Sequence, residues 1–172
     1  MQQKAIMQKK ADGEIRYLFE APPEPGAVQA LLPSLTWVRV PLPFVLNHVN
    51  CWLLDDNDGA GGVTLIDTGA DKPETRELWD RVLTETLAGK HISRLVCTHG
   101  HPDHVGLAGW LVDKLGVRLH MTLAEWLAPQ VWRAESMQPM SKVHKAFFRG
   151  HGLPEAAIVK MDKTREMAPL FV

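Results

Sequence analysis

The stretch RLVCTHGHPDHVG, residues 94–106, places three histidines and one aspartate within six positions. The four residues are His99, His101, Asp103 and His104. Imidazole and carboxylate ligands together suit zinc, manganese or iron, and a set without thiolates argues against a purely structural zinc site. The spacing therefore indicates a catalytic metal centre, and the ligand types leave zinc, manganese and iron open.

A metal of this kind would make water reactive at neutral pH. It lowers the pKa of a bound water to about 7, and a second ion about 3.5–4 Å away can stabilise the charge that develops during hydrolysis. The simpler alternative is that the histidines cap a helix and satisfy hydrogen bonds in the core. That role is usual for a single histidine, but it accounts poorly for three histidines and an aspartate at the end of a strand.

A further carboxylate, Asp67, ends the apolar run VTLIDTG, residues 63–69. In one interpretation Asp67 accepts the outer N–H of an imidazole that binds metal. In the other it only forms the turn that an Asp-Thr-Gly sequence favours. Both interpretations stay open at this point.

The elements that position these residues follow from the apolar periodicity of the chain. The expected elements are strands at 35–42, 49–56, 63–69, 91–99 and 117–121 and helices at 70–87 and 103–116. The first two strands are expected to form an antiparallel hairpin, which leads into the third strand. Asp71 is the expected N-cap of the first helix, and Gly116 the expected C-terminal cap of the second. The alternation over residues 62–121 is typical of a sheet with crossover helices on one face.

Three segments are expected along the chain. Residues 1–33 form an irregular lead-in, because residues 21–33 contain four of the twelve prolines. Residues 34–121 carry the strands and the metal motif. Residues 122–172 form a helical segment, with helices at 123–136, 141–152 and 154–167. The predicted fold class is α+β, a mixed sheet with helices on one face followed by this helical segment.

The motif THGHPDHVG resembles the HxHxDH signature of the metallo-beta-lactamase superfamily. LIDTG is similar to the strand and loop that precede the signature, and LPFVLNHVNCWLL to the opening strands of glyoxalase II-like members. The resemblance implies the N-terminal half of an αββα sandwich and hydrolysis of an ester, thioester, lactone or amide by metal-activated water. It implies one or two metal ions, with zinc as the first expectation and manganese or iron as alternatives. It also implies that His99 and His101 bind the first metal and that Asp103 and His104 bind the second. Asp103 is also the candidate catalytic residue.

Two branches of the superfamily bear on the reaction. Flavodiiron proteins typically have Glu at the position of His101, so the resemblance disfavours reduction of oxygen or nitric oxide. Single-iron persulfide dioxygenases share the HxHxDH pattern and remain an alternative.

The resemblance leaves part of the family's site without a counterpart. A third histidine in a GHTxGH-like loop, a bridging aspartate and a late histidine are not found, and His151 in RGHGLPE is the nearest candidate. We therefore expect two ligands for each metal, one uncovered face of the sheet, and a chain that is half of a longer hydrolase. The alternative is a non-catalytic module that docks on a partner chain or a second copy through helices bearing Trp126, Trp132, Phe147 and Phe148. The same aromatic residues could instead cap the cleft or pack in the core.

Composition narrows the class of function. The 172 residues include 19 basic and 20 acidic side chains, with a formal net charge of −1, and no basic stripe follows the chain. No window approaches the ~20 apolar residues of a membrane span, and the N-terminus lacks the apolar core of a secretion signal. We expect a cytoplasmic protein with a small-molecule substrate and no nucleic-acid or membrane partner. Cys51 and Cys97 lie in apolar runs and are expected to be buried free thiols.

Overall fold

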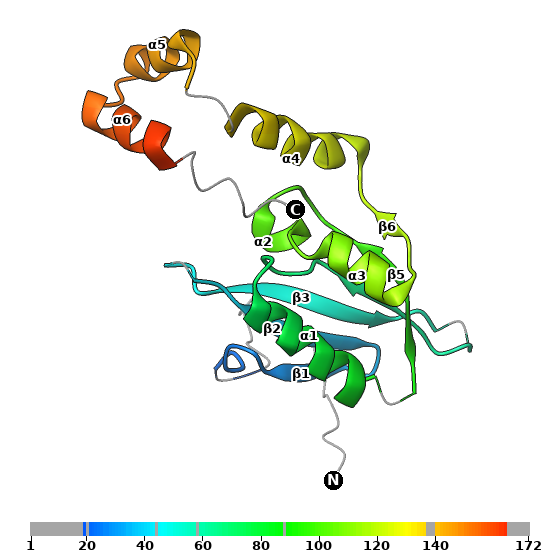
Figure 1. The fold of residues 1–172 in the computed structure, drawn as a ribbon. Coiled ribbons are helices and arrows are strands. Elements are labelled where there is room, and N and C mark those ends of the chain that lie inside the picture. The colour runs from blue at the N-terminus through cyan, green and yellow to red at the C-terminus, as the bar shows by residue number, and fades with distance from the viewer. Residues whose placement is uncertain are drawn as a thin grey trace, which may run out of the picture.

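A mixed β-sheet forms the framework of the protein (Figure 1). The computed structural model describes residues 19, 21–43, 45–57, 59–87, 89–136 and 140–164, without the side chains of residues 132–136 and 164. The strands of this part of the chain are β1 (Val28–Leu32), β2 (Leu35–Pro41), β3 (His48–Asp55), β4 (Gly62–Ile66), β5 (His91–Val96) and β6 (Leu119–His120). They lie in the order β1-β2-β3-β4-β5-β6. Pairing is antiparallel from β1 to β4 and parallel from β4 to β6.

The sheet confirms the predicted α+β fold class and the antiparallel strands that open it. One expectation was wrong, because part of the irregular lead-in over residues 1–33 is a strand. Val28–Leu32 pairs with β2 as an edge strand, with Val28 opposite Val38. The prolines that suggested irregular structure lie before residue 26 and at Pro33, so none of them interrupts the strand. Residues 1–18 lie outside the described residues.

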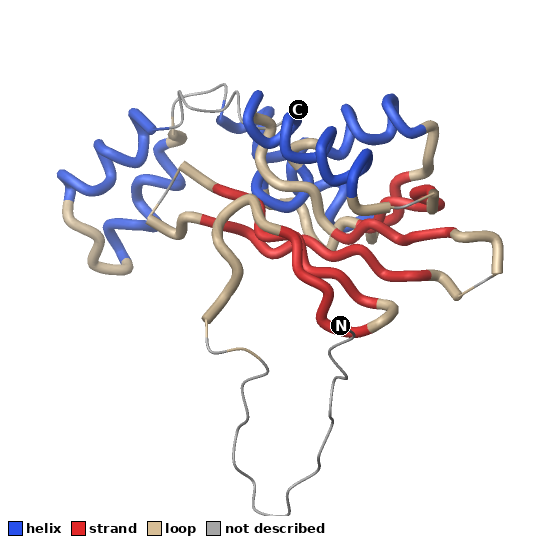
Figure 2. Tube along the Cα trace, turned by 90° about the horizontal axis from the view of Figure 1, so that it is seen from below, coloured by secondary structure: helices blue, strands red, loops and turns tan. Residues whose placement is uncertain are grey.

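Helices α1 (Pro73–Glu85) and α3 (Ala108–Leu115) cover one face of the sheet, and Figure 2 shows the strands with helices gathered on that side. The core between them is built by alternate residues of the strands and by the inner faces of both helices. Its fully buried members include Val38, Val40, Cys51, Leu65, Trp79, Val82, Leu95 and Leu111. Because strand side chains alternate between faces, these same strands present their other residues to the opposite side.

The opposite face of the sheet has no helix over it in the part of the chain that the structure describes. Trp37 and Trp52 stack there with their ring centroids 5.9 Å apart, and both are half-buried. Leu54 on the same face is 39% exposed. The predicted sheet with helices on one face is therefore what the described residues form.

The start of α1 differs from the prediction. Asp71 does not cap the helix; Lys72 occupies the N-cap position and makes no side-chain cap bond. Pro73 is the first helical residue, and proline favours this position because its fixed φ and missing N–H suit a helix start. The Asp71 carboxylate instead accepts hydrogen bonds of 2.8 and 2.9 Å from Arg76.

The single helix predicted over residues 103–116 is two helices. A short α2 (Pro102–Val105) is followed by α3, with a break at Gly106 and Leu107. The Leu107 N–H donates to the Thr68 hydroxyl at 3.1 Å and to the Gly69 carbonyl at 3.2 Å, so tertiary bonds replace the helical one. The predicted cap at Gly116 is confirmed by its left-handed φ of 65°.

The predicted helical segment after β6 is confirmed as α4 (Leu123–Ser136), α5 (Lys142–Gly150) and α6 (Glu155–Thr164). In Figure 1 these helices extend beyond the sheet, with α5 beside α6. Ile158 is fully buried, whereas Trp126 and Phe147 are 48% and 56% exposed. Core packing is therefore the wrong role for these two aromatic residues, and the side chain of Trp132 lies outside the described residues.

The buried free state predicted for Cys51 and Cys97 is confirmed. Within the described ranges, no helix combines the length and apolar character needed to cross a membrane. The expected cytoplasmic location stays a prediction.

Candidate metal centre

The candidate residues lie where β5 ends and α2 begins. The histidine loop, defined here as residues 97–101, leaves the carboxyl end of β5 beside the carboxyl end of β4, which runs parallel to it. Pro102 is the first residue of α2 and His101 is its N-cap, with a φ of −71° and an extended conformation. Asp103 and His104 therefore fall in the single turn of α2, directly after the loop. This sharp change from strand to helix brings all four motif residues to one end of the sheet.

Two pairs of possible ligand atoms result. Nε2 of His99 lies 3.0 Å from Nδ1 of His101, and Nε2 of His104 lies 3.6 Å from the Asp103 carboxylate. The rings of His99 and His104 are adjacent, with centroids 4.0 Å apart. In tetrahedral zinc with Zn–N distances of about 2.0–2.1 Å, two ligand atoms lie about 3.3 Å apart. The observed separations are close to this value, so each pair could hold one edge of a metal's coordination sphere.

Asp67 reaches this cluster from the end of β4. Its backbone is left-handed, with φ 60°, and the residue is only 3% exposed. The carboxylate lies 2.8 Å from Nδ1 of His104 and accepts the Thr98 N–H at 2.8 Å. The Thr98 hydroxyl lies 2.8 and 3.0 Å from its two oxygens. Asp67 thus forms the turn and also contacts a motif imidazole, so the two interpretations of this residue are compatible.

These bonds select the tautomers of two histidines. A carboxylate only accepts, so His104 carries its proton on Nδ1 and keeps a lone pair on Nε2, the atom nearest Asp103. The Thr98 hydroxyl gives its one proton to Asp67, and it can then accept from Nδ1 of His99 at 3.0 Å. His99 is left with a lone pair on Nε2, the atom nearest His101. Both Nε2 atoms are therefore available to a cation.

Charge and burial shift the pKa values of these two histidines in opposite directions. Burial lowers the pKa of His104, but its hydrogen bond to Asp67 and the negative charges of Asp67 and Asp103 outweigh burial and raise it. Burial, followed by the positive charges of His104 and His101, lowers the pKa of His99. A site that binds a cation would favour the neutral form of both rings.

Thr68 is a structural residue of the site that the sequence did not reveal. It is fully buried, and its hydroxyl donates to the His104 carbonyl at 2.9 Å while accepting the Leu107 N–H. Its own carbonyl accepts the indole N–H of Trp79 at 2.6 Å. Threonine in an Asp-Thr-Gly sequence indicates a turn, and only the structure shows that the same turn holds α2.

Glu125 is a second residue that was missed. It lies in α4, and its carboxylate accepts the N–H of Gly100 at 2.9 Å, between the two histidines of the loop. No sequence pattern connects a glutamate of the helical segment to a residue 25 positions earlier.

Neither pair gains a third ligand within the described part of the chain. Over these residues, no three or more histidine, cysteine, aspartate or glutamate side chains are arranged to hold one metal ion. His151, the nearest sequence candidate, lies at the end of α5, where its Nδ1 is 2.8 Å from the Phe147 carbonyl. The donor chemistry and the separations of the four motif residues fit a metal, with two protein ligands in each pair.

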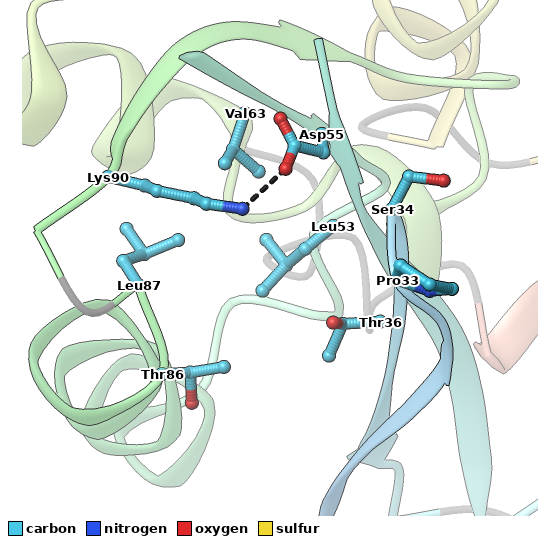
Figure 3. A pocket seen from close by; sticks show the side chains of 9 residues that line it. All are labelled: Pro33, Ser34, Thr36, Leu53, Asp55, Val63, Thr86, Leu87 and Lys90. Carbon is cyan, nitrogen blue, oxygen red and sulfur yellow. Dashed lines mark hydrogen bonds and ion pairs between the residues drawn. The ribbon is translucent and has the colours of Figure 1, made fainter. Parts of the chain in front are cut away.

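A separate hollow lies at the other end of the sheet (Figure 3). Leu53, Val63 and Leu87 line it, together with the ion pair between Lys90 and Asp55. Lys90 precedes β5, whereas the histidine loop follows it, so the two features lie at opposite ends of the strand. Since no histidine lines this hollow, it takes no part in the candidate metal centre.

Comparison with known families identifies one superfamily. The model of the metallo-beta-lactamase superfamily matches residues 45–165, which include β3–β6, the histidine loop and all of α4 and α5. The chain belongs to the metallo-beta-lactamase superfamily. Superfamily members typically bind metal ions such as zinc, so the family is consistent with the ligand chemistry of the motif.

Individual relatives of this superfamily chain are considerably longer. A probable metallo-hydrolase of Bacillus subtilis, YqjP, is 36% identical over 88 residues, which cover 48% of this chain and 25% of the relative. A beta-lactamase domain protein from Burkholderia ambifaria is 35% identical, with a TM-score of 0.69 over 88% of this chain and 43% of that protein. A metallo-beta-lactamase family protein from Thermus thermophilus is 34% identical, with a TM-score of 0.56 over 80% of this chain and 43% of that protein. The matched part of the chain thus covers 25% of the length of the Bacillus subtilis relative and 43% of the length of each of the two solved structures.

Proposed function

We propose that the protein is a metal-dependent hydrolase that acts on an ester, thioester, lactone or amide carbonyl. The observation that carries the proposal is the pairing of four ligand atoms at one end of the sheet: Nε2 of His99 with Nδ1 of His101, and Nε2 of His104 with Asp103. Membership of the superfamily and the name of the Bacillus subtilis relative support metal-dependent hydrolysis in general.

In this proposal His99 and His101 bind one ion, and Asp103 and His104 bind a second. Catalytic zinc usually has three protein ligands and a water, so two ligands for each ion leave each site incomplete. We propose that further ligands come from residues outside the four. The relatives support this idea, because the chain spans only 43% of the two solved structures.

The metal would supply a water of lowered pKa and an electrophile for the carbonyl oxygen. The work of the chain's own residues is to hold the ligands and to orient the nucleophile. The hydrogen bond from His104 to Asp67 keeps Nε2 as the ligand atom. One oxygen of Asp103 faces that Nε2, and we assign to the Asp103 carboxylate the role of accepting a proton or hydrogen bond from the attacking water.

The surroundings of the loop support a proposal about the class of substrate. Helix α4 contacts the loop at Gly100, and its exposed side chains include Trp126, next to the contacting Glu125. We infer that the exposed apolar side chains of α4 line one wall of the cleft, and such a wall favours a small organic molecule with an apolar part over a highly charged one.

The first test is the metal content of purified protein by elemental analysis, followed by assays on ester, thioester, lactone and amide substrates. We expect zinc or manganese in the preparation, and hydrolysis that is lost in His101→Ala and Asp103→Ala. His120→Ala is the matched control, because His120 is exposed at the end of β6. One equivalent of iron with oxygen consumption and no hydrolysis would overturn the proposal in favour of the dioxygenase alternative. Absence of metal and of activity would favour a non-catalytic module.

A further inference from the structure

Helix α4 is attached to the histidine loop through Glu125. The sequence Thr122-Leu-Ala-Glu125 has the form of a capping box, in which the glutamate side chain turns back to the N-cap N–H. Half of this motif is present, because the Glu125 N–H donates to the Thr122 hydroxyl at 3.3 Å. The Glu125 carboxylate, however, accepts the N–H of Gly100 at 2.9 Å. A side chain that would ordinarily complete a local cap thus bonds to the loop.

The backbone of α4 is also fitted to Gly100. A Cβ atom at Gly100 would lie 2.6 Å from the Glu125 carbonyl oxygen and 2.7 Å from the ring of Pro129. Pro129 has no N–H, so it cannot donate to the Glu125 carbonyl four residues before it. That carbonyl faces the Gly100 backbone instead. Gly100 and Pro129 are both buried at this contact.

Helix α4 makes this contact at Gly100, the residue between His99 and His101. The orientation of the Gly100 peptide determines the positions of the Cα and Cβ atoms of His99 and His101. The ligand atoms of these two side chains lie 3.0 Å apart. A bond that holds the Gly100 N–H therefore limits how far the two imidazoles can move relative to each other. Loss of a partner that hydrogen-bonds a metal ligand directly typically weakens binding by about 10–100-fold, and we expect the lower end of that range for a contact made through the backbone.

We propose that Glu125 is a positioning residue for the His99 and His101 pair, acting through the Gly100 N–H, and that this bond couples α4 to the metal centre. The inference rests on the proposed function, since it concerns the same pair of ligands. Its consequence is that the helical segment after β6 helps to build the metal site in addition to forming a wall beside it.

The test compares Glu125→Ala with Glu125→Gln. Glutamine keeps a carbonyl acceptor of the same length but removes the charge, so the pair separates the hydrogen bond from the electrostatic effect of a carboxylate near a cation. Glu77→Ala is the control for the loss of an exposed glutamate elsewhere. Two quantities are measured: amide hydrogen exchange of Gly100 in metal-free protein, and zinc affinity by competition with a chromophoric chelator.

We expect Glu125→Ala to speed Gly100 exchange and to weaken zinc binding by about tenfold or more. Glu125→Gln and Glu77→Ala should keep both quantities near wild type. The inference is overturned if Glu125→Ala leaves them unchanged, or if Glu125→Gln loses as much zinc affinity as Glu125→Ala. A wild-type chain that binds neither zinc nor manganese would count against the proposed function, and not against the contact between Glu125 and Gly100. The exchange measurement uses metal-free protein and would still decide whether Glu125 holds the Gly100 N–H.

Discussion

Asp67 and His104 are 37 positions apart in sequence, yet the Asp67 carboxylate lies 2.8 Å from Nδ1 of the imidazole. Asp67 can reach the ring because its left-handed backbone turns the chain sharply at the end of β4. Aspartate is among the few non-glycine residues that adopt this conformation readily. The turn that leaves β4 therefore carries a group that orients a residue of the helix after β5.

Replacing this carboxylate should weaken metal binding. Asp67→Asn suits the left-handed backbone, but one amide oxygen cannot accept from the Thr98 N–H, the Thr98 hydroxyl and His104 together. We expect zinc affinity to fall by about 10–100-fold in a competition titration. Asp80→Asn is the control, because Asp80 is an exposed partner of Lys114. Equal affinities of Asp67→Asn and wild type would show that His104 does not depend on this bond.

Thr68 links the turn after β4 to α2, and Thr68→Val should destabilise the fold. Valine has nearly the same shape, but it neither donates to the His104 carbonyl nor accepts from the Leu107 N–H. We expect the free energy of unfolding to fall by about 1–3 kcal/mol, measured by chemical denaturation. Thr84→Val, at an exposed position of α1, should change it by much less.

Two glycines near the break between α2 and α3 should respond oppositely to alanine. A Cβ at Gly106 would lie 2.3 Å from the Pro102 carbonyl and 3.0 Å from Asp71 N, whereas a Cβ at Gly109 meets no atom within 4 Å. Gly106→Ala should cost about 1–3 kcal/mol of stability through overpacking. Gly109→Ala should gain about 0.5–1 kcal/mol, because Gly109 lies inside helix α3. Thermal unfolding of both variants tests the pair, and equal shifts would contradict the close packing at Gly106.

Much of this fold follows from local sequence patterns. Alternation over residues 35–42 predicts β2 because one face of that strand is core and the other is not. The apolar period of α1 likewise places Leu78 and Val82 inside. The histidine motif is recognisable because its four residues are close in sequence. All of these features depend on neighbours within about one helix turn or one hairpin.

Two local sequence patterns near the histidine loop are overridden by hydrogen bonds to distant groups. The helix predicted over residues 103–116 breaks because Leu107 bonds to Thr68 and Gly69 instead of continuing the helix. The capping box of α4 is incomplete because Glu125 bonds to Gly100. In each case the local pattern is correct for an isolated segment, and a tertiary hydrogen bond replaces the local one. Both of these exchanged hydrogen bonds lie beside the histidine loop, where the ends of β4 and β5 meet helices α2 and α4.

The two cysteines provide a test of the core beneath the site. Burial, and after it the negative charge of Asp67, raises the pKa of the Cys51 thiol well above its ordinary value. Cys51 and Cys97 are both buried in the folded protein. Because thiolate is the reactive form and burial limits access, an aromatic disulfide reagent should label the folded protein very slowly throughout the range from pH 7 to 9. After denaturation both thiols should react, and their rate should rise with pH as ordinary thiols ionise. Rapid labelling of the folded protein would mean that the β3 and β5 core opens readily or that at least one thiol is exposed to water.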